Sequence, residues 1–203
     1  MITIVNYGVG NLFSLESSFR AVGCDVNVTG DYSSVKNAEK ILLPGVGAFR
    51  DAADKLKGSG LDVLLREKAK EGTPILGVCL GMQLLFDKSF EYGEWDGLGL
   101  ISGEIRPISD FVPEDLKIPH MGWNALHFTE PKHPLFKYIN EGEHVYFVHS
   151  FSAVHCKESI IASCEYGGMV TAAAANGNVM GCQFHPEKSG KAGLSILRAF
   201  AEM

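Results

Sequence analysis

Short apolar runs alternate with helix-like segments through the first half of the chain, and this alternation constrains the fold most strongly. Strands that are joined by helical crossovers lie parallel in one sheet. Runs that are apolar along their whole length are typical of a sheet covered on both faces. The predicted strands span residues 2–5, 25–28, 41–43 and 75–78, and the predicted helices span residues 12–22, 61–69 and 80–86.

Beyond Gly97 the predicted strands follow one another closely. Asn176-Gly177 is a strong hairpin signal between residues 171–175 and 179–184. Apolar spacing predicts a closing helix over residues 194–200. No repeat or linker interrupts the chain, so we expect one α/β domain over residues 1–203, with a mostly parallel central sheet flanked by helices and an antiparallel extension. The other predicted strands span residues 100–108, 123–128, 144–154 and 160–165.

Charge and cysteine content narrow the function classes. The net charge of −6 argues against a nucleic-acid binder, which needs a basic face to meet phosphates. No apolar run approaches the roughly 20 residues of a membrane span, and the first residues do not resemble a signal peptide. Five cysteines without a CxxC pair, and histidines without metal-ligand spacing, predict a reduced, cytoplasmic protein without a metal site.

The most informative motif is Gly77-Val78-Cys79-Leu80-Gly81, which joins a predicted buried strand to a predicted helix. A nucleophile on such a sharp turn is favoured because the helix N-terminus stabilises a thiolate and the flanking glycines relieve crowding. The N–H of Leu80 would point at the same place and help to hold an oxyanion. The alternative is a small buried cysteine with no chemical role.

His185 and Glu187 are the candidate base and its orienting partner. They follow a predicted strand in the sequence Gln183-Phe184-His185-Pro186-Glu187. Residues two apart in an extended chain project to the same side, so the carboxylate can fix the histidine tautomer. An unrelated pair at a strand end is the alternative, and His149 is the main rival base, interpreted as a partly buried histidine or a substrate contact.

Pro44-Gly45-Val46-Gly47 follows the third predicted strand. Loops after parallel strands gather at one edge of a sheet, where ligands bind. The two glycines let a backbone N–H turn towards a developing oxyanion, although an ordinary strand-to-helix turn has the same composition.

Together these motifs resemble class I glutamine amidotransferases, and among them the glutaminase subunits of imidazole glycerol phosphate synthase. The resemblance spans nearly the whole chain. Residues 6–12, 44–49, 77–86, 119–124, 146–150 and 183–189 carry it. It implies a flavodoxin-like fold and hydrolysis of L-glutamine to glutamate and ammonia, without a cofactor. The ammonia passes to a (β/α)8-barrel cyclase, the second subunit of a heterodimer in histidine biosynthesis.

The resemblance also implies the role of each site residue. Cys79 is the nucleophile, His185 the general acid and base, and Glu187 its orienter, while Leu80 and the residues Gly45, Val46 and Gly47 form the oxyanion hole. The positions that match the family's glutamine contacts are Gln83, Glu91, Ser150 and Phe151. The positions that match its partner-facing residues are Asn11, Trp123 and Lys188. The sequence departs from the common family pattern at Asn6, Phe90, Phe151 and Gly190.

Three other functions remain open at this level. A paralogous amidotransferase subunit that feeds a different synthase, such as one for surface-sugar amination, would have the same three catalytic residues. A cysteine hydrolase on a similar fold would be active without a partner. A non-catalytic ligand-binding module would not need a reactive thiol.

Overall fold

A computed structural model describes residues 1–203, and its centre is an eight-stranded mixed sheet. In spatial order, the first five strands of the sheet pair in parallel. The remaining three strands continue the sheet through antiparallel pairing, which begins next to the fifth strand. The order is β2 (Val26–Thr29), β1 (Ile2–Val5), β3 (Ile41–Leu43), β4 (Ile75–Val78), β14 (Val179–Cys182), β13 (Met169–Asn176), β12 (Ile160–Glu165) and β9 (His127–Phe128).

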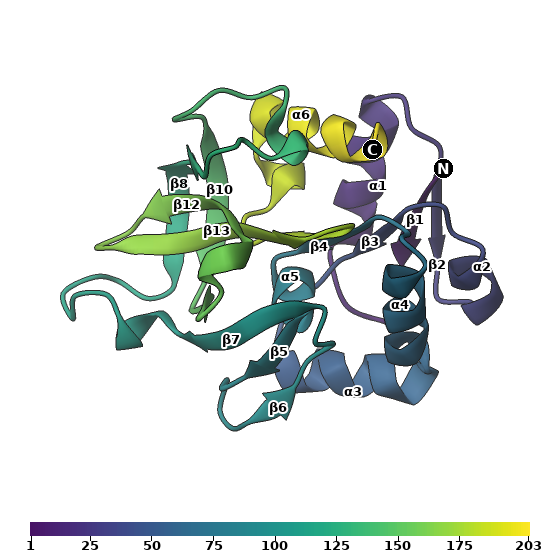
Figure 1. Ribbon diagram of the computed structural model, residues 1–203, viewed down its shortest axis with the longest axis horizontal. Helices are drawn as coiled ribbons and strands as arrows, with labels where there is room; N and C mark the ends of the chain where they lie inside the picture. Colours follow the sequence, from purple (N-terminus) through teal and green to yellow (C-terminus); the bar gives the residue numbers. More distant parts are fainter.

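Helices cover both faces of this sheet (Figure 1). One face carries α1 (Leu12–Ala21) and α6 (Gly190–Ala201), and the other carries α3 (Phe49–Ser59), α4 (Leu61–Lys70) and α5 (Leu80–Leu84). The short helix α2 (Tyr32–Lys36) lies near α4. Four single 3-10 turns complete the helical elements: η1 (Ile108–Asp110), η2 (Pro134–Phe136), η3 (Lys157–Ser159) and η4 (Pro186–Lys188).

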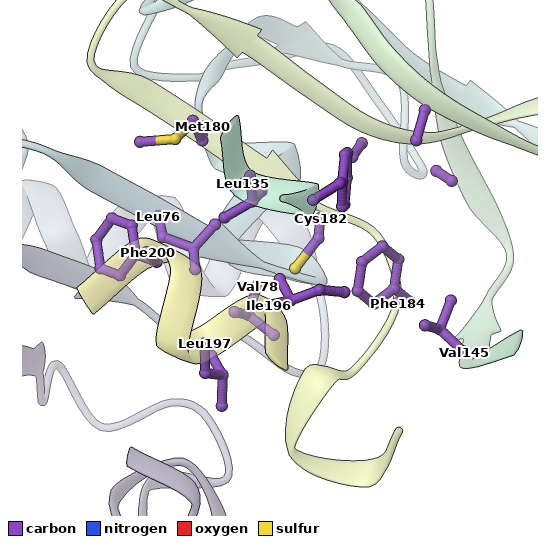
Figure 2. Packing of buried hydrophobic residues seen from close by; sticks show 14 of the residues in the cluster. Leu76, Val78, Leu135, Val145, Met180, Cys182, Phe184, Ile196, Leu197 and Phe200 are labelled. Atoms are coloured by element: carbon purple, nitrogen blue, oxygen red, sulfur yellow. The ribbon is translucent and has the colours of Figure 1, made fainter. Parts of the chain in front are cut away.

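The sheet separates two apolar cores because successive side chains of a strand point to opposite faces. In β4, Leu76 and Val78 belong to the core beneath α1 and α6, whereas Ile75 belongs to the core beneath α3 and α4. Figure 2 shows Ile196 and Phe200 of α6 packed over Leu76 and Val78. Strands with apolar residues on both faces need helices on both sides of the sheet, and their parallel pairing brings the loops that follow them to one edge.

Two smaller sheets complete the molecule. A four-stranded sheet has the order β11 (Phe151–Val154), β7 (Ile101–Pro107), β5 (Phe86–Ser89) and β6 (Trp95–Asp96). A two-stranded antiparallel sheet pairs β8 (His120–Ala125) with β10 (His144–His149). Figure 1 shows β5, β6 and β7 on the α3 side of the large sheet.

Most predicted elements of the first half form as expected, but the sequence prediction was incomplete between residues 30 and 90. It assigned no helix to α2 or α3. The buried positions of α3 include Ala52 and Ala53, which give a weak apolar signal. The predicted helix over residues 80–86 was too long. It ends at Leu84 because the carbonyls of Leu84 and Leu85 accept hydrogen bonds from Leu98 and from residues 100 and 101, and Phe86 then begins β5.

The predicted strand over residues 144–154 divides at Ser150 into β10 and β11, which belong to different sheets. The Ser150 carbonyl accepts a hydrogen bond from the Ile108 N–H at 2.9 Å, where the chain passes between the two sheets. The predicted strand over residues 123–128 starts earlier, at His120, and is interrupted at the buried Leu126. Both interruptions depend on pairing with distant strands, which local apolar patterns do not reveal.

Candidate active site

Cys79 lies on a sharp turn between β4 and α5 at the carboxyl edge of the parallel strands. Its backbone has φ 54° and ψ −112°, a conformation that a side chain with a Cβ rarely adopts. The Cys79 N–H donates to the Cys182 carbonyl at 2.8 Å, which ties the turn to β14. The thiol therefore stands at the N-terminus of α5, where the first backbone N–H groups have no partner within the helix.

The two glycines of the motif are required by close backbone packing. A Cβ at Gly77 would lie 2.6 Å from the Gly81 carbonyl oxygen, and a Cβ at Gly81 would lie 1.9 Å from the Leu43 carbonyl oxygen. Neither position tolerates a side chain without backbone movement. The turn therefore stores its strain in a backbone that the neighbouring strands hold in place.

His185 reaches the same point from the end of β14. Its N–H donates to the Tyr146 carbonyl at 2.9 Å, and the following residues form η4. His185 Nδ1 lies 2.8 Å from Glu187 Oε1, and the two side chains are only 4% and 1% exposed. Because a carboxylate only accepts, Nδ1 carries a hydrogen and Nε2 is left free to interact with Cys79, which helps to raise the pKa of His185.

The charge of His185 follows from three opposing effects. Burial lowers the pKa of His185, but hydrogen bonds to Cys79 and Glu187, together with the negative charges of these groups, raise it to about 9. The imidazolium form is thus stabilised at neutral pH. A protonated histidine beside a cysteine is the arrangement that favours a thiolate nucleophile.

Cys79 and His185 line a cavity of about 380 Å³ that opens to solvent. Among the predicted oxyanion residues, Leu80, Val46 and Gly47 line this cavity as well. Gly45 does not line it and instead packs behind the turn, where a Cβ would lie 2.5 Å from the Gly81 backbone nitrogen.

All four predicted glutamine contacts, Gln83, Glu91, Ser150 and Phe151, line the same cavity. Gln83 Nε2 donates to the Phe151 carbonyl at 3.2 Å, which ties α5 to the break between β10 and β11. Glu91 Oε2 accepts from the Phe49 N–H at 2.5 Å at the start of α3, and burial raises the pKa of this carboxyl. The site thus combines elements from both halves of the chain.

Gln183 is a site residue that the His185 motif contains but to which the sequence analysis gave no role. It is fully buried, and its Nε2 donates to Cys79 Sγ at 3.7 Å. Its Oε1 accepts from Gln83 Nε2 at 3.0 Å, which fixes the orientation of the Gln183 carboxamide. Its position two residues before His185 in one extended strand end was the available signal, since such residues share a side.

Three more lining residues were not predicted as site residues, Tyr92, Pro119 and Val148, and the cavity is also lined by His149, which the sequence analysis interpreted as a partly buried histidine or a substrate contact. Tyr92 is 91% exposed and packs its ring edge-on against Phe151 at 6.0 Å between centroids. His149 is buried and lies in the cavity wall, as a substrate contact would. Tyr92 and Pro119 stand in segments between strands, and no local pattern places them at this edge.

Two of the predicted partner-facing residues lie together. The Trp123 side chain is 53% exposed and contacts Tyr146 edge-on at 6.0 Å, and Lys188 Nζ lies 5.7 Å from the centre of the Tyr146 ring. Asn11 caps α1 without a side-chain hydrogen bond to the helix. A larger open groove of about 520 Å³ runs beside Trp123 and is lined by no cysteine.

The chain contains no group of three or more histidine, cysteine or carboxylate side chains placed to hold a metal ion. The five cysteines are unpaired. None of the helices combines the length and apolar character needed to cross a membrane.

Solved structures with similar folds include a glutamine amidotransferase and PurLQS from Thermotoga maritima. The first has a TM-score of 0.77 at 16% identity and covers 99% of this chain and 97% of the other. The second has a TM-score of 0.75 at 19% identity and covers 99% and 97%. These likenesses confirm the predicted fold class.

Sequence relatives match over the whole length. A chain named imidazole glycerol phosphate synthase subunit HisH in Oceanobacillus iheyensis is 44% identical and covers 100% of this chain and 99% of its own length. Its counterpart in Sulfurimonas denitrificans is 46% identical and covers 100% and 98%. The family model for class-I glutamine amidotransferases matches residues 3–203. The chain therefore belongs to the class-I glutamine amidotransferase family, within the group of HisH subunits of imidazole glycerol phosphate synthase.

Proposed function

We propose that this chain is a single glutaminase domain that hydrolyses L-glutamine and delivers the ammonia to a cyclase subunit in histidine biosynthesis. The single observation that carries the proposal is that Cys79 and His185 meet at one cavity, with Glu187 bound to His185 behind it. Full-length similarity to HisH subunits favours this pathway over a paralogous synthase. The cytoplasmic location expected from the sequence stays a prediction.

The reaction begins with attack of the Cys79 thiolate on the side-chain amide carbon of glutamine. The N–H of Leu80, with one N–H from the loop of Val46 and Gly47, stabilises the tetrahedral oxyanion. His185 gives its proton to the leaving nitrogen, and ammonia departs from a thioester.

Hydrolysis of the thioester completes the cycle. His185, neutral after the first step, takes a proton from water, and the hydroxide attacks the thioester carbon. Glu187 holds the Nδ1–H of His185 through both steps and stabilises the imidazolium each time it forms. Collapse releases glutamate and restores the Cys79 thiolate and the protonated His185.

The partner is proposed to dock on the side of the molecule where Trp123, Lys188 and Asn11 lie. Ammonia reacts only in its unprotonated form, and bulk water near neutral pH protonates most of it. A cyclase seated over this side would receive ammonia without that loss. If docking also aims the loop of Val46 and Gly47 correctly, the isolated chain lacks one oxyanion donor, which costs roughly 10²–10³ in rate.

The test is the Cys79→Ala variant, assayed for glutamate release with the cyclase subunit present. We expect release to fall to background while the cyclase still uses added ammonium salts in the same mixture. Undiminished glutamate release would refute the nucleophile. High wild-type glutaminase activity without any cyclase would instead favour an independent cysteine hydrolase.

A further inference from the structure

Two buried histidines beside the catalytic residues form a hydrogen-bonded pair that the proposed reaction does not use. His120 Nδ1 lies 2.9 Å from His149 Nε2. His120 is fully buried on β8, and His149 is 6% exposed on β10 in the wall of the cavity. The strand register places the two residues directly opposite each other.

The pair is the middle of a chain of contacts that ends on a backbone carbonyl at each side. At one end, Asn124 Nδ2 donates to the Glu165 carbonyl at 2.9 Å, so Asn124 Oδ1 faces His120 Nε2 at 2.8 Å. At the other end, His149 Nδ1 lies 2.8 Å from the Phe151 carbonyl. The two oxygens that face the histidines, Asn124 Oδ1 and the Phe151 carbonyl, can only accept hydrogen bonds.

The hydrogens of neutral side chains do not suffice for this chain of contacts. His149 must place its hydrogen on Nδ1 to reach the Phe151 carbonyl, which leaves a lone pair on Nε2. His120 must place its hydrogen on Nε2 to reach Asn124 Oδ1, which leaves a lone pair on Nδ1. Two lone pairs would then face each other at 2.9 Å. One additional proton between the rings satisfies every contact.

The surroundings assign this proton to His120. Its ring is stacked between Tyr166, at 4.0 Å between centroids, and Phe147, at 4.9 Å. Aromatic faces attract a cation, and here two of them cover both sides of one imidazole. Burial lowers the pKa of His149 to about 3 despite its bond to the Phe151 carbonyl, so this ring stays neutral.

Burial also acts against a charge on His120, whose pKa it lowers, while the hydrogen bond to Asn124 acts in the opposite direction. The stacked aromatic rings favour the charged form of His120, as the hydrogen bond to Asn124 does. The contact to His149 favours it too, because this contact lacks a hydrogen when both rings are neutral. The other titratable groups nearby are Tyr166, which donates to the Lys117 carbonyl, and His185, which shares the cavity wall with His149.

Cys79 lines the same cavity as His149 and His185. Two further titratable residues, Cys164 and Glu165, directly precede Tyr166 in the chain. Burial raises the pKa of the Cys164 thiol on β12 to about 12 and keeps it neutral. Glu165 contributes only its backbone carbonyl to the contacts described here.

We propose that His120 is an imidazolium that locks neutral His149 as a hydrogen-bond donor to the Phe151 carbonyl in the wall of the glutamine cavity. The same carbonyl accepts from Gln83, and Gln83 in turn binds Gln183, which donates to Cys79. His120 and His149 are thus positioning residues. They hold the segment where β10 and β11 separate and, through it, the amide side chains that reach the thiol.

The protonation state is tested by NMR of the full chain labelled with ¹⁵N-histidine, without substrate. The signals of His120 and His149 are assigned from the His120→Gln and His149→Gln variants. At pH 7.5 we expect both ring nitrogens of His120 to be protonated and only Nδ1 of His149. A wild-type spectrum in which His120 carries a single ring hydrogen at this pH would overturn the proposal.

Asn124→Leu is the sharpest variant, since it removes the acceptor that makes the extra proton necessary. Neutral His120 can then turn its hydrogen to Nδ1 and donate to His149. We expect the titration midpoint of His120 to fall by at least about one pH unit, the size of a typical environmental shift. An unchanged midpoint would also contradict the proposal. Asn178→Leu is the matched control, because Asn178 likewise donates to backbone carbonyls, of Ala69 and Thr73, but away from this site.

The positioning role rests on the proposed glutaminase function, whereas the NMR result does not. His149→Phe keeps an aromatic ring but removes the donor to the Phe151 carbonyl. We expect KM for glutamine to rise about fivefold, as for one lost net hydrogen bond, with a smaller change in kcat. Measured with the cyclase subunit present, an unchanged KM in an active variant would refute the positioning role, whereas a wild-type chain with no glutaminase activity in that assay would refute the function instead.

Discussion

At the scale of single residues, the site depends on how His185 is held between Cys79 and Glu187. The carboxylate of Glu187 binds the nitrogen facing away from the thiol, and the neighbouring charges raise the pKa of His185 to about 9. The ordinary value for histidine is about 6.5. In the proposed reaction, His185 is thus protonated when the Cys79 thiolate attacks.

This shift predicts a pH dependence of stability. The folded state binds the His185 proton more tightly than the unfolded state, so the stabilisation is complete below pH about 6.5 and is lost as pH rises through about 9. In Cys79→Ala the pKa of His185 should fall, because the hydrogen bond and charge of Cys79 are gone. Urea unfolding at pH 6, 7.5 and 9 should show a shallower decline for the variant. A steeper decline would contradict the assigned partner.

A second prediction concerns the buried carboxamide beside the thiol. Gln183→Leu removes the N–H that donates to Cys79 Sγ while preserving most of the side-chain volume. Loss of a donor to a charged group should slow alkylation of Cys79 by iodoacetamide about tenfold near neutral pH. Mass spectrometry of the Cys79 peptide measures the rate, and Cys79→Ala identifies any background labelling of the other cysteines. An unchanged rate would show that Gln183 only fills space.

At the scale of elements, the junction of β4 and α5 is fixed by backbone contacts rather than by side chains. Gly81→Ala would place a methyl group 1.9 Å from the Leu43 carbonyl oxygen. The overlap forces β3 or α5 to shift, and we expect a loss of at least about 2 kcal/mol in the free energy of unfolding. Urea titration measures the loss.

Gly58→Ala is the matched control for this prediction. Gly58 lies within α3, and a Cβ there would meet no atom within 4 Å. Alanine in a helix is favoured over glycine by about 0.5–1 kcal/mol, so this variant should be neutral or slightly more stable. Equal losses from both variants would show that the junction has no special constraint.

The elements also show how far the sequence predicts the fold. The parallel strands and α1, α4 and α6 were predictable because their apolar spacing is strong and local. The four-stranded sheet was not, because β5 and β6 are short and pair with segments that show no matching pattern. In the site, Cys79 and His185 could be found from motifs, whereas His149 and Gln183 obtain their contacts from distant elements.

At the scale of the whole molecule, the cavity lies beside a surface suited to a protein partner. Trp123 and Met121 on β8 are 53% and 60% exposed, and Lys188 extends across the Tyr146 ring nearby. Exposed aromatic side chains in such a cluster are typical of protein interfaces. The Tyr146 carbonyl accepts from the N–H of His185, which lines the cavity, and this link supports the proposed transfer of ammonia to the partner.

This surface yields the last prediction. Trp123→Ala should weaken binding of the cyclase about 30-fold, the effect of losing a central aromatic contact of about 2 kcal/mol. Isothermal titration calorimetry with purified cyclase measures the change. Val63→Ala is the control, since Val63 is 52% exposed on α4, on the opposite side of the large sheet from α1 and α6. Equal weakening by both variants would place the interface elsewhere.

The close packing of Gly45, Gly77 and Gly81 has a consequence for engineering this enzyme. At these three positions the backbone packs directly against the backbone of a neighbouring segment. None of the three therefore has room for a designed side chain. New substrate preferences must therefore come from the rest of the cavity lining, to which Tyr92, Val148 and Phe151 contribute. Libraries confined to these three positions should retain folded, alkylatable protein, whereas libraries that include the glycines should consist largely of misfolded chains.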